Sequence, residues 1–152
     1  MAIQNIYLDT EILMSYFDDH DKGRTARETI AQVKKMIRSK EIKAIVPQTV
    51  LGELMLNSCR DKCNVIKIKE LLHELEADFP NANSAEMQCA RDLIADDNGY
   101  IQPNDALIVA HALMDDNASW LLTNDTKLVG NLAILKKMGE TGNQFNIAEK
   151  FN

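Results

Sequence analysis

The chain has 152 residues, of which 45% are hydrophobic and 26% charged, as in an ordinary soluble globular protein. This length predicts a single domain, residues 1–152, with a core that needs no disulfides. The formal net charge of −6 argues against a general nucleic-acid binder, which is usually basic. No run approaches the ~20 apolar residues of a membrane span. No signal peptide is visible, so we expect a cytosolic protein.

The first elements are predicted from hydrophobic patterning. Residues 3–8 form an apolar run typical of a strand, and residues 10–17 begin a short helical pattern. A turn that closes on a glycine is predicted for residues 18–23. Residues 24–39 then place their apolar side chains on one helical face, which predicts a second helix.

The middle of the chain continues the alternation of strands and helices. Residues 43–47 form a short buried strand that ends at a proline. Residues 48–58 are helical and apolar on most sides, and residues 61–78 predict an amphipathic helix. The Asn-Ser pair at 83–84 is a plausible N-cap for a helix at 85–96.

The last part of the chain contains one more helix and two strands. A proline at its first turn favours a helix over residues 103–115. Residues 119–123 form a buried strand, and a weak final strand is predicted around residues 144–147. No internal repeat or low-complexity segment separates these elements.

Short strands that alternate with helices imply parallel crossover connections. We therefore predict an α/β fold, a three-layer α/β/α sandwich with a small parallel sheet. In such sheets ligands bind at the carboxyl ends of the strands, near the point where the strand order reverses. Asp9 and Asp125 both come directly after predicted strands, so both are expected at that edge.

Four acidic residues lie at the edges of apolar elements: Asp9, Glu53, Asp105 and Asp125. Three of them also fit purely structural roles. Asp9 and Asp125 are each suited to cap a helix, and Asp105 lies in a first helical turn, where the helix dipole favours an acid.

Glu53 has no such structural role in the sequence. It lies inside an apolar helix, with no basic residue three or four positions away. A largely buried glutamate is costly unless it is paired or bound to a metal.

Together, the four carboxylates predict a metal site. Unpaired carboxylates that lie close together repel each other and raise each other's pKa. A divalent cation reverses that cost, and an all-oxygen ligand set favours Mg²⁺ or Mn²⁺. A metal-activated water beside such a site suits phosphodiester hydrolysis.

Four features of the sequence together resemble a PIN-domain nuclease: LDT, a glutamate in the helix after the second strand, NDALIVAHAL and LLTND. Within that family the sequence is most similar to VapC-type toxin ribonucleases. The resemblance implies Mg²⁺- or Mn²⁺-dependent cleavage of RNA, a homodimer and inhibition by an antitoxin protein. It assigns catalysis and metal binding to the four acidic residues. It also implies that Thr10 and Thr123 orient water, with Asn124 in support.

Several alternatives remain at the level of sequence. One is a PIN-domain RNA-processing nuclease without an antitoxin, and another is a non-catalytic PIN-fold interaction module. A phosphoaspartyl protein is disfavoured, because Glu53 falls within a helix and Glu11 is the wrong residue type for the phosphohydrolase pair.

Overall fold

The computed structural model describes residues 3–60 and 65–151, apart from the side chains of residues 22 and 58–60. Four parallel strands form one sheet in the order β2-β1-β3-β4. The strands are β1 (Gln4–Leu8), β2 (Ile42–Ile45), β3 (Ala118–Leu122) and β4 (Asn146–Ala148).

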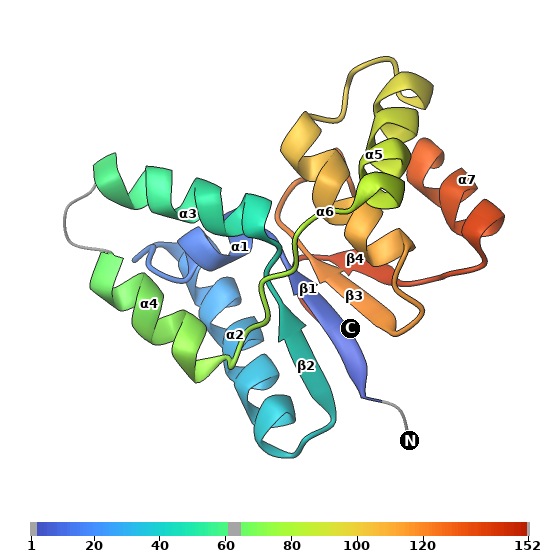
Figure 1. Ribbon diagram of the computed structural model, residues 1–152. Coiled ribbons are helices and arrows are strands. Elements are labelled where there is room, and N and C mark those ends of the chain that lie inside the picture. The colour runs from blue at the N-terminus through green and yellow to red at the C-terminus, as the bar shows by residue number, and fades with distance from the viewer. Residues whose placement is uncertain (1–2, 61–64, 152) are drawn as a thin grey trace.

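Seven helices are found among the described residues: α1 (Thr10–Ser15), α2 (Asp21–Arg38), α3 (Gln48–Arg60), α4 (Val65–Glu74), α5 (Ser84–Asp96), α6 (Pro103–Leu113) and α7 (Leu132–Thr141). Helices α1 to α4 gather on one side of the sheet and α5 to α7 on the other (Figure 1). This arrangement confirms the predicted three-layer α/β/α fold. None of the described helices is long and apolar enough to span a membrane.

The strand order reverses next to β1. From β1 the chain moves outward to β2 on one side, and later returns to place β3 on the other side. Tyr7 therefore pairs with both Ile45 and Leu121. The carboxyl ends of β1 and β3 consequently flank the point at which parallel sheets of this kind bind ligands.

The core explains why α6 lies next to the sheet. Its residues Ile108, Val109 and Leu113 are fully buried, and the helix contacts β3, α5 and α7. A helix that is apolar nearly all round is stable only when it is enclosed. This burial fixes the N-terminus of α6, which is the end that bears Asp105.

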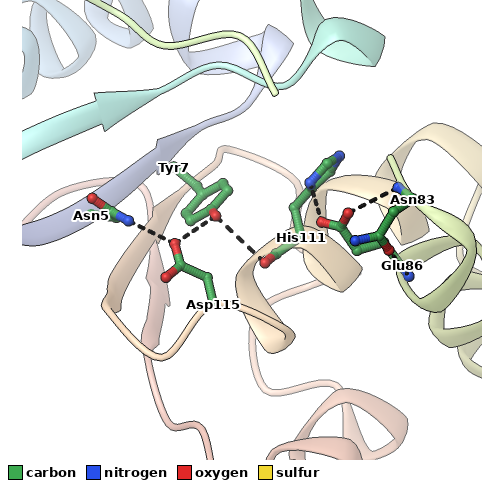
Figure 2. Close-up of polar contacts among 6 residues, drawn as sticks. All are labelled: Asn5, Tyr7, Asn83, Glu86, His111 and Asp115. Atoms are coloured by element: carbon green, nitrogen blue, oxygen red, sulfur yellow. Dashed lines mark hydrogen bonds and ion pairs between the residues drawn. The ribbon is translucent and has the colours of Figure 1, made fainter. Parts of the chain in front are cut away.

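Buried polar contacts attach α6 to α5 (Figure 2). His111 Nδ1 lies 2.6 Å from Glu86 Oε2, and both side chains are almost completely buried. The other oxygen of Glu86 accepts from the backbone N–H of Asn83 at 3.0 Å, which completes a capping box at the start of α5. Burial lowers the pKa of His111, although the neighbouring Glu86 acts in the opposite direction.

A second polar contact attaches α6 to β1. The hydroxyl of Tyr7 donates to Asp115 Oδ2 at 2.7 Å, and the amide of Asn5 donates to the same oxygen at 2.8 Å (Figure 2). Burial, followed by the hydrogen bond to Asp115, raises the pKa of Tyr7. Asp115 follows the C-terminus of α6, so this contact holds the end of the helix that lies away from Asp105.

Several element boundaries differ from those predicted. Helix α2 begins at Asp21 rather than after residue 23, so the predicted turn at 18–23 is wrong in its second half. The N–H of Gly23 already donates to the carbonyl of His20 at 3.0 Å, as part of the first helical turn. Helix α4 is described from Val65, and the predicted start of that helix at 61–64 lies outside the described residues.

Helix α7 was not predicted. The side chain of its N-cap residue, Asn131, accepts from the N–H of Ile134 at 3.1 Å, and Gly142 ends the helix in the left-handed conformation. Both end signals are present in the sequence. Only two residues of the helix, Ile134 and Met138, are buried. Its apolar stripe is therefore narrow, and the hydrophobic periodicity of the segment is too weak to predict a helix.

Gly23 provides the first test of the fold. A Cβ added to Gly23 would lie 1.7 Å from the carbonyl oxygen of Asp18, so the backbone must shift to accept it. We expect Gly23→Ala to lower the free energy of unfolding by about 1–3 kcal/mol, measured by urea denaturation. Gly52 in α3 has nothing within 4 Å of its added Cβ, so Gly52→Ala is the matched control and should stabilise by about 0.5–1 kcal/mol. Equal effects would contradict the close approach at Gly23.

Glu86 provides the second test. Glu86→Ala removes the buried partner of His111 and one half of the capping box. We expect a loss of about 1–3 kcal/mol in the free energy of unfolding, because the buried Nδ1 of His111 is left without its hydrogen-bond partner. Glu70→Ala, at an exposed position of α4, is the control and should change stability by less than about 0.5 kcal/mol. A similar small change at both positions would show that the pair does not hold α5 to α6.

Candidate metal centre

A cavity of about 800 Å³ opens at the carboxyl edge of the sheet, and all four predicted acidic residues line it. Asp9 follows β1 and Asp125 follows β3, while Glu53 and Asp105 come from α3 and α6. Segments far apart in the sequence therefore bring their carboxylates to one place, at the reversal of strand order.

Asp9 is the most buried of the four, with 3% of its surface exposed. Its Oδ1 accepts from the N–H of Thr10 at 2.8 Å, and its Oδ2 accepts from the hydroxyl of Thr123 at 2.7 Å. Asp9 also caps α1, so the structural role that its position suggested coexists with its place in the cavity. Burial raises the pKa of Asp9 to about 6, although these two hydrogen bonds act to lower it.

Glu53 is partly buried on α3. Its Oε1 accepts from the hydroxyl of Thr10 at 3.1 Å. Thr10 thus contacts two of the acids, Asp9 through its backbone and Glu53 through its side chain. The partner of Glu53 comes from a different element, which explains why no partner was visible within its own helix.

Asp105 shows most clearly that the four acids act on one another. Burial raises its pKa to about 7, with further contributions from the negative charges of Asp9, Asp125 and Glu53, in that order, and from a hydrogen bond with the Asp125 side chain. The ordinary pKa of an aspartate is near 3.8. A positive charge placed among these groups would offset the same repulsion.

The loop after β3 is held by the other predicted residues. Thr123 is fully buried, and its hydroxyl accepts from the N–H of Asp125 at 3.0 Å while it donates to Asp9. The amide of Asn124 points elsewhere and donates to the hydroxyl of Ser15 in α1 at 2.9 Å. Asn124 therefore anchors the loop to α1, and its amide does not lie among the four acids.

The donor set fits a hard divalent cation, because its side-chain ligands are all carboxylate oxygens that lie in a partly buried cavity. Among the described residues, no three His, Cys, Asp or Glu side chains are arranged so that they would hold a metal ion as they stand. The cavity brings the acids together and raises the pKa of two of them, but their side chains are not in a ligating arrangement.

Several residues of the cavity wall were not predicted. They are Glu11, Met14, Ser15, Asp18, Asn57, Gln102, Pro103 and Asn104. Two of them have a signal in the sequence: Asn57 follows Glu53 by one helical turn, and Asn104 directly precedes Asp105. Asp18 had none, because it reaches the cavity through the loop that precedes α2.

Comparison with known proteins agrees with this geometry. The model of the PIN domain family matches residues 6–130. The fold is similar to that of a chain in the crystal structure of VapBC2 from Rickettsia felis bound to a DNA fragment from their promoter, with 18% identity and a TM-score of 0.57. That match covers 98% of this chain and 100% of the other, and it shows the fold alone. No curated protein sequence matches the chain.

The family match extends from β1 to the loop after β3, so it includes the segments that bear all four acids. The chain therefore belongs to the PIN domain family, whose members are generally nucleases.

Proposed function

We propose that this protein is a metal-dependent endoribonuclease that hydrolyses RNA phosphodiester bonds. The observation that best supports this function is that one cavity gathers four carboxylates from four separate segments of the chain. In agreement with this geometry, burial first, and then the charges of the other three acids, raise the pKa of Asp105. Four acids held in mutual repulsion destabilise a fold unless a ligand compensates for them. A cation is the ligand that does so, and the PIN family supplies the nuclease chemistry.

In this proposal Asp9, Glu53 and Asp105 hold one Mg²⁺ or Mn²⁺ ion. Asp125 acts with Asp9 on a second ion or from the outer sphere. A divalent cation, when bound, supplies Lewis acidity to the phosphodiester and to the attacking water. No side chain needs to act as a general base.

The surrounding residues keep the acids in place. The hydroxyl of Thr123 and the N–H of Thr10 each donate to one oxygen of Asp9, which fixes the plane of that carboxylate and leaves further lone pairs on both oxygens. Thr10 also positions Glu53. Asn124 supports the site indirectly, because its bond to Ser15 holds the loop that bears Asp125.

We also propose that the protein is the toxin of a toxin–antitoxin pair and that it forms a homodimer. The similarity to a chain of the VapBC2 complex, which covers 98% of this chain, supports the toxin assignment. The homodimer is proposed from the resemblance to VapC-type toxins. We further infer that residues 1–152 form one nuclease domain, because the buried side chains make a single core cluster. A processing nuclease without an antitoxin would have the same site, and a non-catalytic module is disfavoured by the presence of all four acids.

Replacement of each acid by its amide tests the catalytic assignment. We expect Asp9→Asn, Glu53→Gln, Asp105→Asn and Asp125→Asn each to reduce Mn²⁺-dependent cleavage of RNA by at least about 100-fold, on the order of the loss when one electrostatic group of an active site is removed. The measurement is gel-based cleavage of a labelled RNA, with circular dichroism to establish folding.

Asp116→Asn is the matched control, because Asp116 is exposed just before β3, at the opposite edge of the sheet. It should retain full activity. Full activity in the folded Asp9→Asn or Glu53→Gln protein would exclude the proposed site.

The raised pKa values of Asp9 and Asp105 predict how stability depends on pH without metal. Both groups hold a proton more tightly when folded than when unfolded, so the free energy of unfolding falls as pH rises from about 4 to 7. In Asp105→Asn this loss should be smaller, and the variant should have a higher Tm than the wild type at pH 8 in EDTA. The lowered pKa of His111 makes the free energy of unfolding rise with pH. Because His111 is present in both proteins, this contribution cancels when they are compared.

Mn²⁺ should remove this difference between the two proteins. It should raise the Tm of the wild type in proportion to the logarithm of its concentration, and raise that of Asp105→Asn much less. If the variant and the wild type lose the same stability between pH 5 and pH 8, the acids do not repel one another as described.

A further inference from the structure

The wall of the metal-site cavity is unusually acidic for a cavity that is proposed to take RNA. Six carboxylates line it: Asp9, Glu11, Asp18, Glu53, Asp105 and Asp125. Among the described residues of this wall, none is Lys, Arg or His. The described wall therefore offers no side-chain cation to the phosphates of a substrate, and it repels them wherever a metal ion does not intervene.

Besides the carboxylates and the hydroxyls of Thr10 and Ser15, the polar side chains of the cavity wall are three neutral amides. Asn57 lies on α3 one turn after Glu53, Gln102 is the N-cap residue of α6, and Asn104 precedes Asp105. The side chain of Gln102 makes no capping hydrogen bond. A neutral amide has no charge with which to attract a phosphate, and its N–H groups match the acceptor atoms on the edges of nucleobases.

Asn104 differs from the other two amides because the fold fixes its orientation. The hydroxyl of Thr49, in the first turn of α3, donates to Asn104 Oδ1 at 3.0 Å. The acceptor of this amide is thereby engaged, and both hydrogens of Nδ2 remain as donors. Asn104 is exposed at the cavity, so the donors are open to a substrate.

We propose that Asn104 is a specificity-determining residue, which donates a hydrogen bond to a base of single-stranded RNA next to the scissile phosphate. This inference rests on the proposed function. Unstacked bases of single-stranded RNA present their edges to side chains, as a paired helix does not. Thr49 keeps the donor side of the amide toward the substrate, and Asn57 and Gln102 provide further contacts to the same nucleotides.

The test measures base preference in two ways. A randomised single-stranded RNA pool is cleaved in Mn²⁺, and the cleaved ends are sequenced. In parallel, fluorescence anisotropy measures the binding of labelled A, C, G and U decamers in Ca²⁺. The wild type is compared with Asn104→Asp, which keeps an acceptor for Thr49 but loses the donors, and with Thr49→Val, which frees the amide to rotate.

We expect the wild type to prefer one base at one position beside the cleavage site. Asn104→Asp should reduce that preference on the order of tenfold, as when one base contact is lost, and Thr49→Val should reduce it less. The ratio between bases is the readout, because the added charge beside Asp105 also lowers the overall rate. Asn117→Asp is the control: it places a carboxylate beside Asp115 and Asp116, at the far edge of the sheet, and should keep the wild-type ratio.

The outcomes separate this inference from the proposed function. Cleavage without base preference, or with a preference that Asn104→Asp leaves unchanged, overturns the role of Asn104 and leaves the nuclease function intact. Base-selective binding that Asn104→Asp abolishes, in a protein that cleaves no RNA, supports the role of Asn104 and rejects the nuclease function. Neither binding nor cleavage of any RNA overturns both.

Discussion

The hydrogen bonds that enclose Asp9 are the constraint on which the site depends. This carboxylate is almost fully buried, and it is tolerated there because Thr10 and Thr123 each donate to one of its oxygens. The same two threonines contact Glu53 and the backbone of Asp125. One buried carboxylate therefore sets the positions of two others, and the strands β1 and β3 set its own position.

Asp105 is positioned by a different set of contacts. Its position depends on α6, which is held by apolar burial along its length, by the His111–Glu86 pair in its last turn and by the Tyr7–Asp115 contact beyond its end. These contacts lie outside the cavity, yet they determine how closely the charge of Asp105 approaches that of Asp9. The repulsion among the carboxylates destabilises the folded protein. The packing of α6 into the core offsets this cost.

Sequence predicts the parts of this protein that local patterns determine. The alternation of strands and helices predicts the parallel sheet, and the position of Asp9 and Asp125 after strands predicts that they meet. The start of α2 was wrong because aspartates and a glycine are typical of turns, whereas Gly23 is needed for the close approach of the Asp18 carbonyl. Helix α7 was missed because few of its residues are buried. The Thr49–Asn104 contact spans 55 positions of the chain, and no local pattern indicates it.

The acidity of the chain has a different meaning once the cavity is known. A net charge of −6 argues against a general nucleic-acid binder, which is usually basic. Six carboxylates share one cavity, however, and bound divalent cations would reverse the local field where the substrate phosphate is proposed to bind. In the absence of cations this field repels RNA, so the same residues that would cleave the substrate also exclude it. Affinity for RNA would then depend on metal occupancy first, and on neutral groups such as Asn104 second.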